Sequence, residues 1–284
     1  MTVKNVSSMK RGKIIDNKLK SAIYGLAVAD AFGVPYEFKI RGSFKATDMV
    51  GCGSHNQPKG TWSDDTSMTL ATCASIKECG YIDVSDMLSK FRAWANSGKY
   101  AIDGRVFDIG CTTAEALHTG KGKDNERSNG NGSLMRIIPL AFTDASDNEI
   151  KAVSAITHAH DISKTACVCY VHIVRALAQG ARLEDILESI ESPFERIRTI
   201  STLDESEIKS SGYVVSTLEA ALWAVSTTDN YRDAILKAVN LGNDTDTVGA
   251  VAGGLAGIIY GTEGIPPEWI ESLKGKDIIE NCLF

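Results

Sequence analysis

Three glycines stand four residues apart in the segment Val248-Gly249-Ala250-Val251-Ala252-Gly253-Gly254-Leu255-Ala256-Gly257-Ile258-Ile259-Tyr260. In a helix, Gly249, Gly253 and Gly257 share one face, and a face without side chains lets a neighbouring backbone approach closely. The segment is 13 residues long (248–260), which is too short to cross a bilayer. We interpret it as a buried central helix.

Apolar residues recur at three- and four-residue steps in further segments, which is typical of amphipathic helices. The first covers 17–32 and stops at Gly33 and Pro35. The others cover 64–79, 84–96, 108–118, 132–142, 147–159, 163–179, 183–190, 213–227, 231–240 and 246–260. No strand pattern of comparable strength is present, and the six prolines mark no low-complexity linker. The sequence therefore predicts a single all-α domain.

The amino-acid composition and charge of the chain exclude some classes of function. The 284 residues are 43% hydrophobic, which supplies material for a packed interior, and 30 Lys and Arg against 36 Asp and Glu give a net charge of −6. Without a long basic run, the charge disfavours nucleic-acid binding. No signal-peptide core or bilayer-length apolar run is present, so we expect a cytoplasmic protein without a membrane partner.

Two acidic clusters stand directly before expected helices. One is Gly60-Thr61-Trp62-Ser63-Asp64-Asp65-Thr66 and the other is Gly242-Asn243-Asp244-Thr245-Asp246-Thr247. Each cluster is explained by helix capping, but a cap needs only one Asp. If the four carboxylates are buried together they need cations, and an all-oxygen set with two hydroxyls fits Mg²⁺ or Mn²⁺ better than zinc or copper.

A glycine-rich loop, Ser128-Asn129-Gly130-Asn131-Gly132-Ser133, runs into the expected helix of 132–142. Its backbone N–H groups and the helix start could cradle a phosphate, although an ordinary Asn-Gly turn explains the same residues. His158, in Thr157-His158-Ala159-His160-Asp161, lies between two expected helices. It is either a structural cap or a group that hydrogen-bonds the substrate.

Taken together, five stretches resemble the ADP-ribosylglycohydrolase family. In order they are Ala29-Asp30-Ala31-Phe32-Gly33-Val34-Pro35-Tyr36-Glu37-Phe38, Trp62-Ser63-Asp64-Asp65-Thr66-Ser67-Met68, Ser128-Asn129-Gly130-Asn131-Gly132-Ser133-Leu134-Met135-Arg136, Thr157-His158-Ala159-His160 and Gly242-Asn243-Asp244-Thr245-Asp246-Thr247. Phe107-Asp108-Ile109-Gly110, followed by Thr112-Thr113, is also similar to the bacterial branch of dinitrogenase reductase-activating glycohydrolases. Two departures are Ser63, where the family often has Thr, and Ala29, where it often has Gly.

The resemblance implies one orthogonally packed all-α domain over residues 17–284, preceded by a leader of residues 1–16 that is either disordered or a partner-contacting arm. It implies a binuclear Mg²⁺ or Mn²⁺ centre. The implied metal ligands are Ser63, Asp64, Asp65, Asp244, Asp246 and Thr247, and Asp64, Asp65 and Glu37 would be the catalytic carboxylates. The implied substrate contacts are Asp108 on the acceptor side or at the ribose, Ser128, Asn129, Gly130, Asn131 and Gly132 around the pyrophosphate, His158 on ADP-ribose and Tyr213 near the adenosine.

The implied reaction is hydrolysis of the bond that links ADP-ribose to a modified acceptor, with release of ADP-ribose. The bacterial branch favours ADP-ribosylarginine on protein, while serine-linked, O-acetyl and nucleic-acid-linked ADP-ribose stay open. Two other hypotheses compete with it: a non-catalytic ADP-ribose-binding or toxin-blocking protein, and a two-metal phosphohydrolase acting on the pyrophosphate. The retention of all four metal carboxylates favours catalysis over binding alone.

Overall fold

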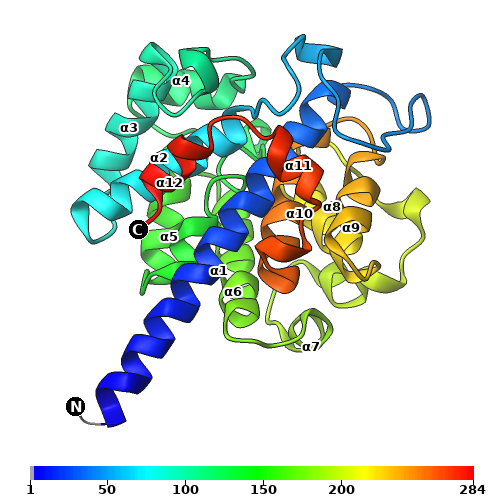
Figure 1. Cartoon of the computed structure of the whole chain (residues 1–284). Helices are drawn as coiled ribbons and strands as arrows, with labels where there is room; N and C mark the ends of the chain where they lie inside the picture. The colour runs from blue at the N-terminus through cyan, green and yellow to red at the C-terminus, as the bar shows by residue number, and fades with distance from the viewer. Residues whose placement is uncertain (1–2) are drawn as a thin grey trace.

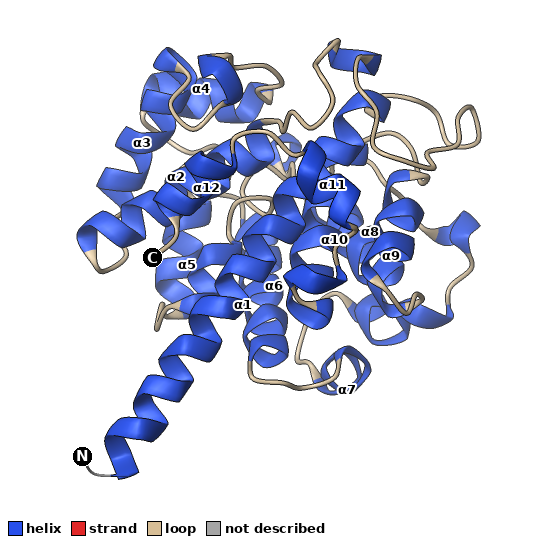
Figure 2. Ribbon diagram, in the orientation of Figure 1, coloured by secondary structure: helices blue, strands red, loops and turns tan. Residues whose placement is uncertain are grey.

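The computed structural model describes residues 3–284, with side-chain environments from Asn17 onward (Figure 1). Its α-helices are α1 (Val3–Gly33), α2 (Asp64–Cys79), α3 (Val84–Ser97), α4 (Cys111–Thr119), α5 (Asp147–Ser154), α6 (Asp161–Ala178), α7 (Leu183–Ser189), α8 (Val214–Ser226), α9 (Tyr231–Val239), α10 (Thr245–Tyr260), α11 (Pro267–Ser272) and α12 (Lys276–Cys282). Figure 2 shows only helices and loops in the part of the chain that is described. The predicted all-α class is confirmed.

Helices α1 and α10 form the centre of the fold and lie side by side in Figure 1. Their backbones touch along the glycine face: a Cβ at Gly253 would lie 2.3 Å from the Gly25 carbonyl oxygen, and one at Gly257 would lie 2.2 Å from the Ser21 carbonyl oxygen. The Tyr231 hydroxyl of α9 donates a 2.5 Å hydrogen bond to the same Gly25 carbonyl. The predicted buried central helix is confirmed, and its glycines set how closely α1 approaches.

Because α1 and α10 are in such close contact, the substitution Gly253→Ala tests how tightly the two helices pack. In an open helix alanine would be favoured over glycine by about 1 kcal/mol. Here the added Cβ would meet backbone oxygen and the Ala29 Cβ at 2.5 Å, so two helices must separate. We expect the free energy of unfolding to fall by about 2 kcal/mol or more, measured by urea denaturation.

Gly110→Ala is the matched control for this substitution. Gly110 has an ordinary φ of −60°, and the atom nearest to an added Cβ lies 4.0 Å away. We expect its stability to stay within about 0.5 kcal/mol of the unmodified chain. Equal effects of the two substitutions would contradict the close packing of α1 on α10.

The expected helix over 132–142 is wrong. Residues 132–136 form turns, and a 3₁₀-helix, η5 (Ile138–Phe142), follows with Pro139 in its first turn. Proline lacks the N–H that an α-helix would need there. The side chains of Leu134, Ile137 and Leu140 are nevertheless fully buried, so their apolar spacing reflects burial in an irregular segment.

Several element boundaries also differ from expectation. Helix α4 begins at Cys111 rather than at 108, and the pattern did not predict α11, α12 or the 3₁₀-helix η6 (Glu195–Thr202). The backbone of residues 3–16, expected to be a separate leader, is helical and continuous with the rest of α1, which extends beyond the body of the molecule in Figure 1. No helix in the described range 3–284 is long and apolar enough to cross a membrane.

Candidate functional site

Helix α2 is capped in a way that leaves two carboxylates free of the capping role. Ser63 is the N-cap, and its Oγ accepts a hydrogen bond from the Asp65 N–H at 3.2 Å. Asp30, from α1, accepts from the N–H groups of Ser63 and Thr66 at 3.0 Å each and from the Thr66 hydroxyl at 2.6 Å. The backbone of the helix start is thus satisfied by Asp30 and Ser63, and helix capping does not account for Asp64 together with Asp65.

The start of α10 carries the second pair. Asp244 is the N-cap residue, but its side chain makes no capping bond to the helix. Its Oδ2 accepts a hydrogen bond from Asn131 Nδ2 at 2.8 Å, and the Asp246 Oδ1 accepts from the Thr247 N–H at 2.9 Å. Capping again fails to account for both carboxylates.

Three oxygens of these carboxylates are shielded from solvent and have no hydrogen-bond partner among the described residues. They are Asp65 Oδ1, Asp244 Oδ1 and Asp246 Oδ2. Native proteins pair nearly all such buried acceptors, because an unpaired one costs free energy of desolvation. Carboxylate oxygens left free in this way fit the coordination of a hard divalent cation.

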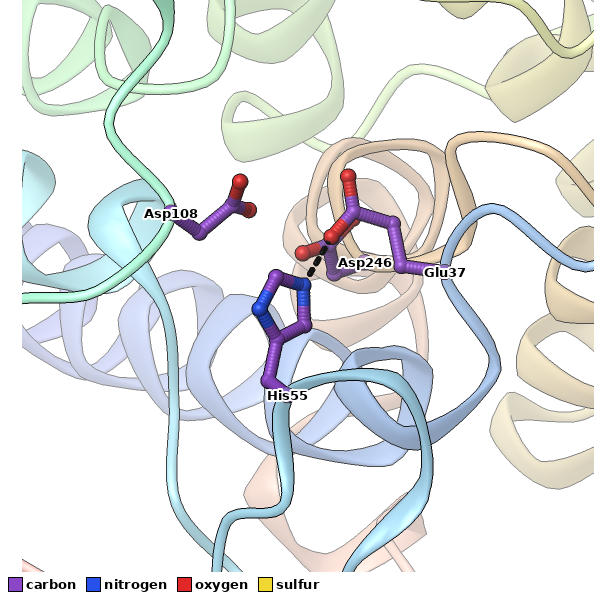
Figure 3. Close-up of side chains that lie close together, drawn as sticks. All are labelled: Glu37, His55, Asp108 and Asp246. Carbon is purple, nitrogen blue, oxygen red and sulfur yellow. Dashed lines mark hydrogen bonds and ion pairs between the residues drawn. The ribbon is translucent and has the colours of Figure 1, made fainter.

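Two groups of side chains converge here and share Asp246. One atom from each of Asp30, Asp65 and Asp246 lies within 4.8 Å of the others. The same holds for Glu37, His55, Asp108 and Asp246, which Figure 3 shows pointing toward one another from four separate segments. Residues that are far apart in the sequence therefore supply one acidic centre, in which His55 is hydrogen-bonded to Glu37.

Burial controls the protonation of this centre. It raises the pKa of Glu37 to about 7, despite the hydrogen bond from His55, and that of Asp30 to about 6. Burial, reinforced by the charges of neighbouring carboxylates, also raises the pKa of Asp64, Asp65 and Asp246 well above the usual range. Several carboxylates without cations thus repel one another in a site that excludes water, and a divalent cation would relieve this repulsion.

The glycine loop lies directly beside the acidic centre. Asn131 of the loop bridges the two, since its Nδ2 donates to Asp244 Oδ2. The same nitrogen also donates to the Thr217 hydroxyl of α8 at 2.9 Å. The Asn131 N–H donates to the Gly212 carbonyl at 3.0 Å, and the Asn129 carbonyl accepts from the Val214 N–H at 3.0 Å. Since no α-helix follows the loop at 132–142, the expected dipole from that segment is absent, and the helix that begins beside the loop is α8.

The remaining predicted substrate residues surround the loop and the acidic centre. Ser128 is buried, His158 is buried beneath Gly130 and Gly132, and Tyr213, which pairs with Gly130 through an isolated bridge, is 42% exposed. Asp108 is half-buried and has a positive φ of 54°, a backbone conformation that is costly for aspartate and is frequent at functional sites. His158 and Tyr213 thus lie against the glycine loop, which Asn131 links to Asp244, and Asp108 lies among the carboxylates.

Sequence reasoning missed two members of the site. Asp30 belongs to the first of the five family-like stretches, and a carboxylate in the otherwise apolar Ala29-Asp30-Ala31 is the signal that indicates a buried hydrogen-bonded role. His55 lies in the Gly- and Pro-containing stretch Gly51–Gly60, and nothing in its local sequence pattern indicates that it contacts Glu37. Only the folded chain brings these side chains together.

The described residues thus form an all-α fold in which two helix starts bury several carboxylates beside a glycine loop. The chain belongs to the ADP-ribosylglycohydrolase family, whose profile matches residues 12–283. A solved structure described as an ADP-ribosylglycohydrolase-related protein complex superposes with a TM-score of 0.79 at 30% identity, and the match covers 95% of this chain and 96% of the other.

Named relatives agree with this assignment. The ADP-ribosylarginine hydrolase Tri1 of Pseudomonas putida (strain GB-1) is 37% identical, and the match covers 93% of this chain and 76% of that protein. Tri1 of Serratia proteamaculans (strain 568) is 36% identical, with 93% and 77% covered. The ADP-ribosyl-[dinitrogen reductase] glycohydrolase of Rhodospirillum rubrum is 31% identical, with 93% of each chain covered. The chain is therefore an ADP-ribosyl glycohydrolase.

Proposed function

We propose that this enzyme hydrolyses the N-glycosidic bond between ADP-ribose and an arginine side chain of a modified protein, with two Mg²⁺ or Mn²⁺ ions as cofactors. The observation that carries the cofactor proposal is the set of three shielded, unpartnered oxygens on Asp65, Asp244 and Asp246. The names of the Pseudomonas, Serratia and Rhodospirillum relatives support the choice of an ADP-ribosylated protein, and the two Tri1 names support arginine.

The cations would be held by oxygen ligands from the two helix starts. The proposed ligands are Ser63, Asp64, Asp65, Asp244, Asp246 and Thr247. Asp30 is not among them, because both of its oxygens already accept hydrogen bonds from Ser63 or Thr66. When bound, such cations fix ribose hydroxyls and lower the pKa of a nearby water.

The chain's own side chains divide the remaining work. Asp64 or Asp65 would accept the proton of the attacking water, and Glu37 would position that water at the anomeric carbon. Asp108, whose carboxylate lies close to those of Glu37 and Asp246, would contact the acceptor side or the ribose. Cleavage passes through an oxocarbenium-like state, which an acidic pocket stabilises on the ribose side.

The substrate's diphosphate would lie in the glycine loop. Residues 128–132 and His158 would contact the phosphate groups, and the half-exposed ring of Tyr213 would stack near the adenosine. This arrangement orients the ribose toward the carboxylates, because Asn131 links the loop to Asp244. The partner is thus an ADP-ribosylated protein, and the product is ADP-ribose.

Arginine-ADP-ribosylated protein is the substrate for the direct test. With Mg²⁺ we expect release of intact ADP-ribose, detected by mass spectrometry, and we expect EDTA to stop it. Release of AMP instead would point to cleavage of the pyrophosphate. Release only from serine-, O-acetyl- or DNA-linked ADP-ribose would overturn the arginine assignment and keep the hydrolase.

A further inference from the structure

Arg136 is a fully buried guanidinium that forms no salt bridge within the described residues. Its Nε donates to the Gly132 carbonyl at 3.1 Å, and its Nη2 donates to Thr157 Oγ1 at 2.8 Å. Both of its terminal nitrogens lie 3.4 Å from the Val153 carbonyl, and the Phe91 ring centroid lies 4.4 Å from its Cζ. A buried charge is costly unless its hydrogen bonds are well made, so the groups it holds are well fixed.

The Thr157 hydroxyl, which Arg136 holds in place, in turn contacts the ring of His158. Thr157 Oγ1 lies 2.9 Å from His158 Nδ1 and, in the described part of the chain, has no other hydrogen-bond partner than Arg136. Arginine can only donate, so Thr157 Oγ1 accepts from it. The hydroxyl hydrogen then has one available acceptor, His158 Nδ1. A neutral ring that accepts at Nδ1 carries its hydrogen on Nε2.

The protonated nitrogen faces the glycine loop. A Cβ at Gly130 would lie 3.3 Å from His158 Nε2, and a Cβ at Gly132 would lie 2.8 Å from His158 Cε1. Side chains at these positions would therefore cover the ring edge, so the glycines leave it open toward the loop. Burial, with the nearby Arg136 charge, lowers the pKa of His158 to about 3, and the ring is neutral at physiological pH.

The backbone of His158 is fixed as well. Its N–H donates to the Ser154 carbonyl at 2.9 Å, and its carbonyl accepts from the Ser154 hydroxyl at 3.1 Å. The Ser154 Oγ also lies 2.9 Å from the Ser133 Oγ, within hydrogen-bonding distance, which ties the end of the loop to the same turn. Ring orientation and ring position are therefore both set before any ligand arrives, which reduces the ordering cost of binding.

We propose that Arg136 and Thr157 are positioning residues that hold His158 in the tautomer with hydrogen on Nε2, so that it donates to a phosphate oxygen of ADP-ribose in the glycine loop. The tautomer follows from the contacts of the free protein alone. The identity of the ligand rests on the proposed function. A neutral donor held in this way recognises the diphosphate without adding a charge to the site.

The first experiment measures the tautomer directly. Two-bond ¹H–¹⁵N NMR spectra of the five histidines distinguish protonated from unprotonated ring nitrogens, and a His158→Gln variant assigns the signal. We expect hydrogen on Nε2 in the unmodified protein and in Thr157→Ser, which keeps the hydroxyl. Thr157→Val, of nearly equal volume, should lose this single tautomer. Hydrogen on Nδ1 in the unmodified protein, or no change in Thr157→Val, would overturn the proposal.

The second experiment measures ADP-ribose affinity by calorimetry in the presence of Mg²⁺. We expect Thr157→Val to weaken binding about tenfold, as loss of one well-made donor allows, and Thr157→Ser to stay within about twofold. Thr72→Val is the matched control, because Thr72 is fully buried and its hydroxyl donates, among the residues that the structure describes, only to the Met68 carbonyl of the same helix. An equal loss in Thr72→Val would reduce the effect to general packing and contradict the positioning role.

The two experiments separate the proposal from the proposed function. If the tautomer behaves as expected while the unmodified protein fails to bind ADP-ribose, the link from Arg136 through Thr157 to His158 stands and the ligand assignment is wrong. If ADP-ribose binds normally but the tautomer is on Nδ1, the proposed function stands and the positioning role is wrong.

Discussion

Replacing Asp64 and Asp65 together with asparagine should abolish release of ADP-ribose from arginine-modified protein. Asparagine keeps the volume and one oxygen of each side chain but removes two charges from the proposed cation ligands and the proposed proton acceptor. We expect the rate to fall by about 1,000-fold or more, which corresponds to about 4 kcal/mol in the activation free energy. The measurement is ADP-ribose release at saturating Mg²⁺.

Asp83→Asn is the matched control, because it makes the same chemical change at another helix start. Asp83 is the N-cap of α3 and accepts from the N–H groups of Ser85 and Asp86 at 2.9 Å and 3.0 Å. Asparagine caps about as well as aspartate, so both stability and turnover should be nearly unchanged. If the double variant at α2 keeps more than about a tenth of the activity, those two carboxylates do not carry the chemistry.

The second large effect is a loss of stability with rising pH when cations are removed. Burial raises the folded-state pKa of Glu37 from 4.5 to about 7 and that of Asp30 from 3.8 to about 6, and it raises those of Asp64, Asp65 and Asp246 too. At a pH between the unfolded-state pKa and the higher folded-state pKa of these carboxyl groups, the folded state binds more protons than the unfolded state does. The free energy of unfolding therefore falls as pH rises from about 4 to about 7, by several kcal/mol in all.

Urea denaturation at pH 4.5, 6 and 8 with EDTA measures this slope, and the same series with Mg²⁺ or Mn²⁺ should remove or reverse it. Carboxylates whose pKa is lowered, such as Asp161 and Asp204, act in the opposite direction, but they are exposed and screened by solvent. Asp65→Asn should flatten the slope and stabilise the cation-free protein at pH 8. A metal-free protein that gains stability from pH 5 to pH 8 would contradict the buried cluster.

How much of this site the sequence predicts depends on how local its signals are. Ser63 with Asp64 and Asp65 predicts the start of α2, and Asp244 with Asp246 predicts the start of α10, because helix starts have recognisable polar residues. That the two starts face each other is a tertiary fact, expected here only through a family resemblance. The ion pair between His55 and Glu37 has no local signal, since it joins two loop residues in the folded chain.

The fold shows the same division between local and tertiary information. The glycine face of α10 predicted a close helix neighbour correctly but did not say that the neighbour is α1. At 132–142 the apolar spacing was misleading, because Ile137 and Ile138 are fully buried in turns and a 3₁₀-helix rather than on one face of an α-helix. Periodicity measures which residues are buried, and a buried irregular segment satisfies it as well as a helix does.

The pairing of α1 with α10 brings together carboxylates from the two ends of the sequence, so the acidic centre can be completed only late in synthesis of the chain. Asp30 and Glu37 leave the ribosome early, whereas Asp244 and Asp246 are among the last polar residues of the site to be made. A nascent chain that still lacks α10 presents an unpaired glycine and alanine face on α1 and only part of the acidic centre. Because the acidic centre needs Asp246 from α10 together with Asp30 and Glu37 from the start of the chain, we expect a chain truncated before α10 to have no hydrolase activity.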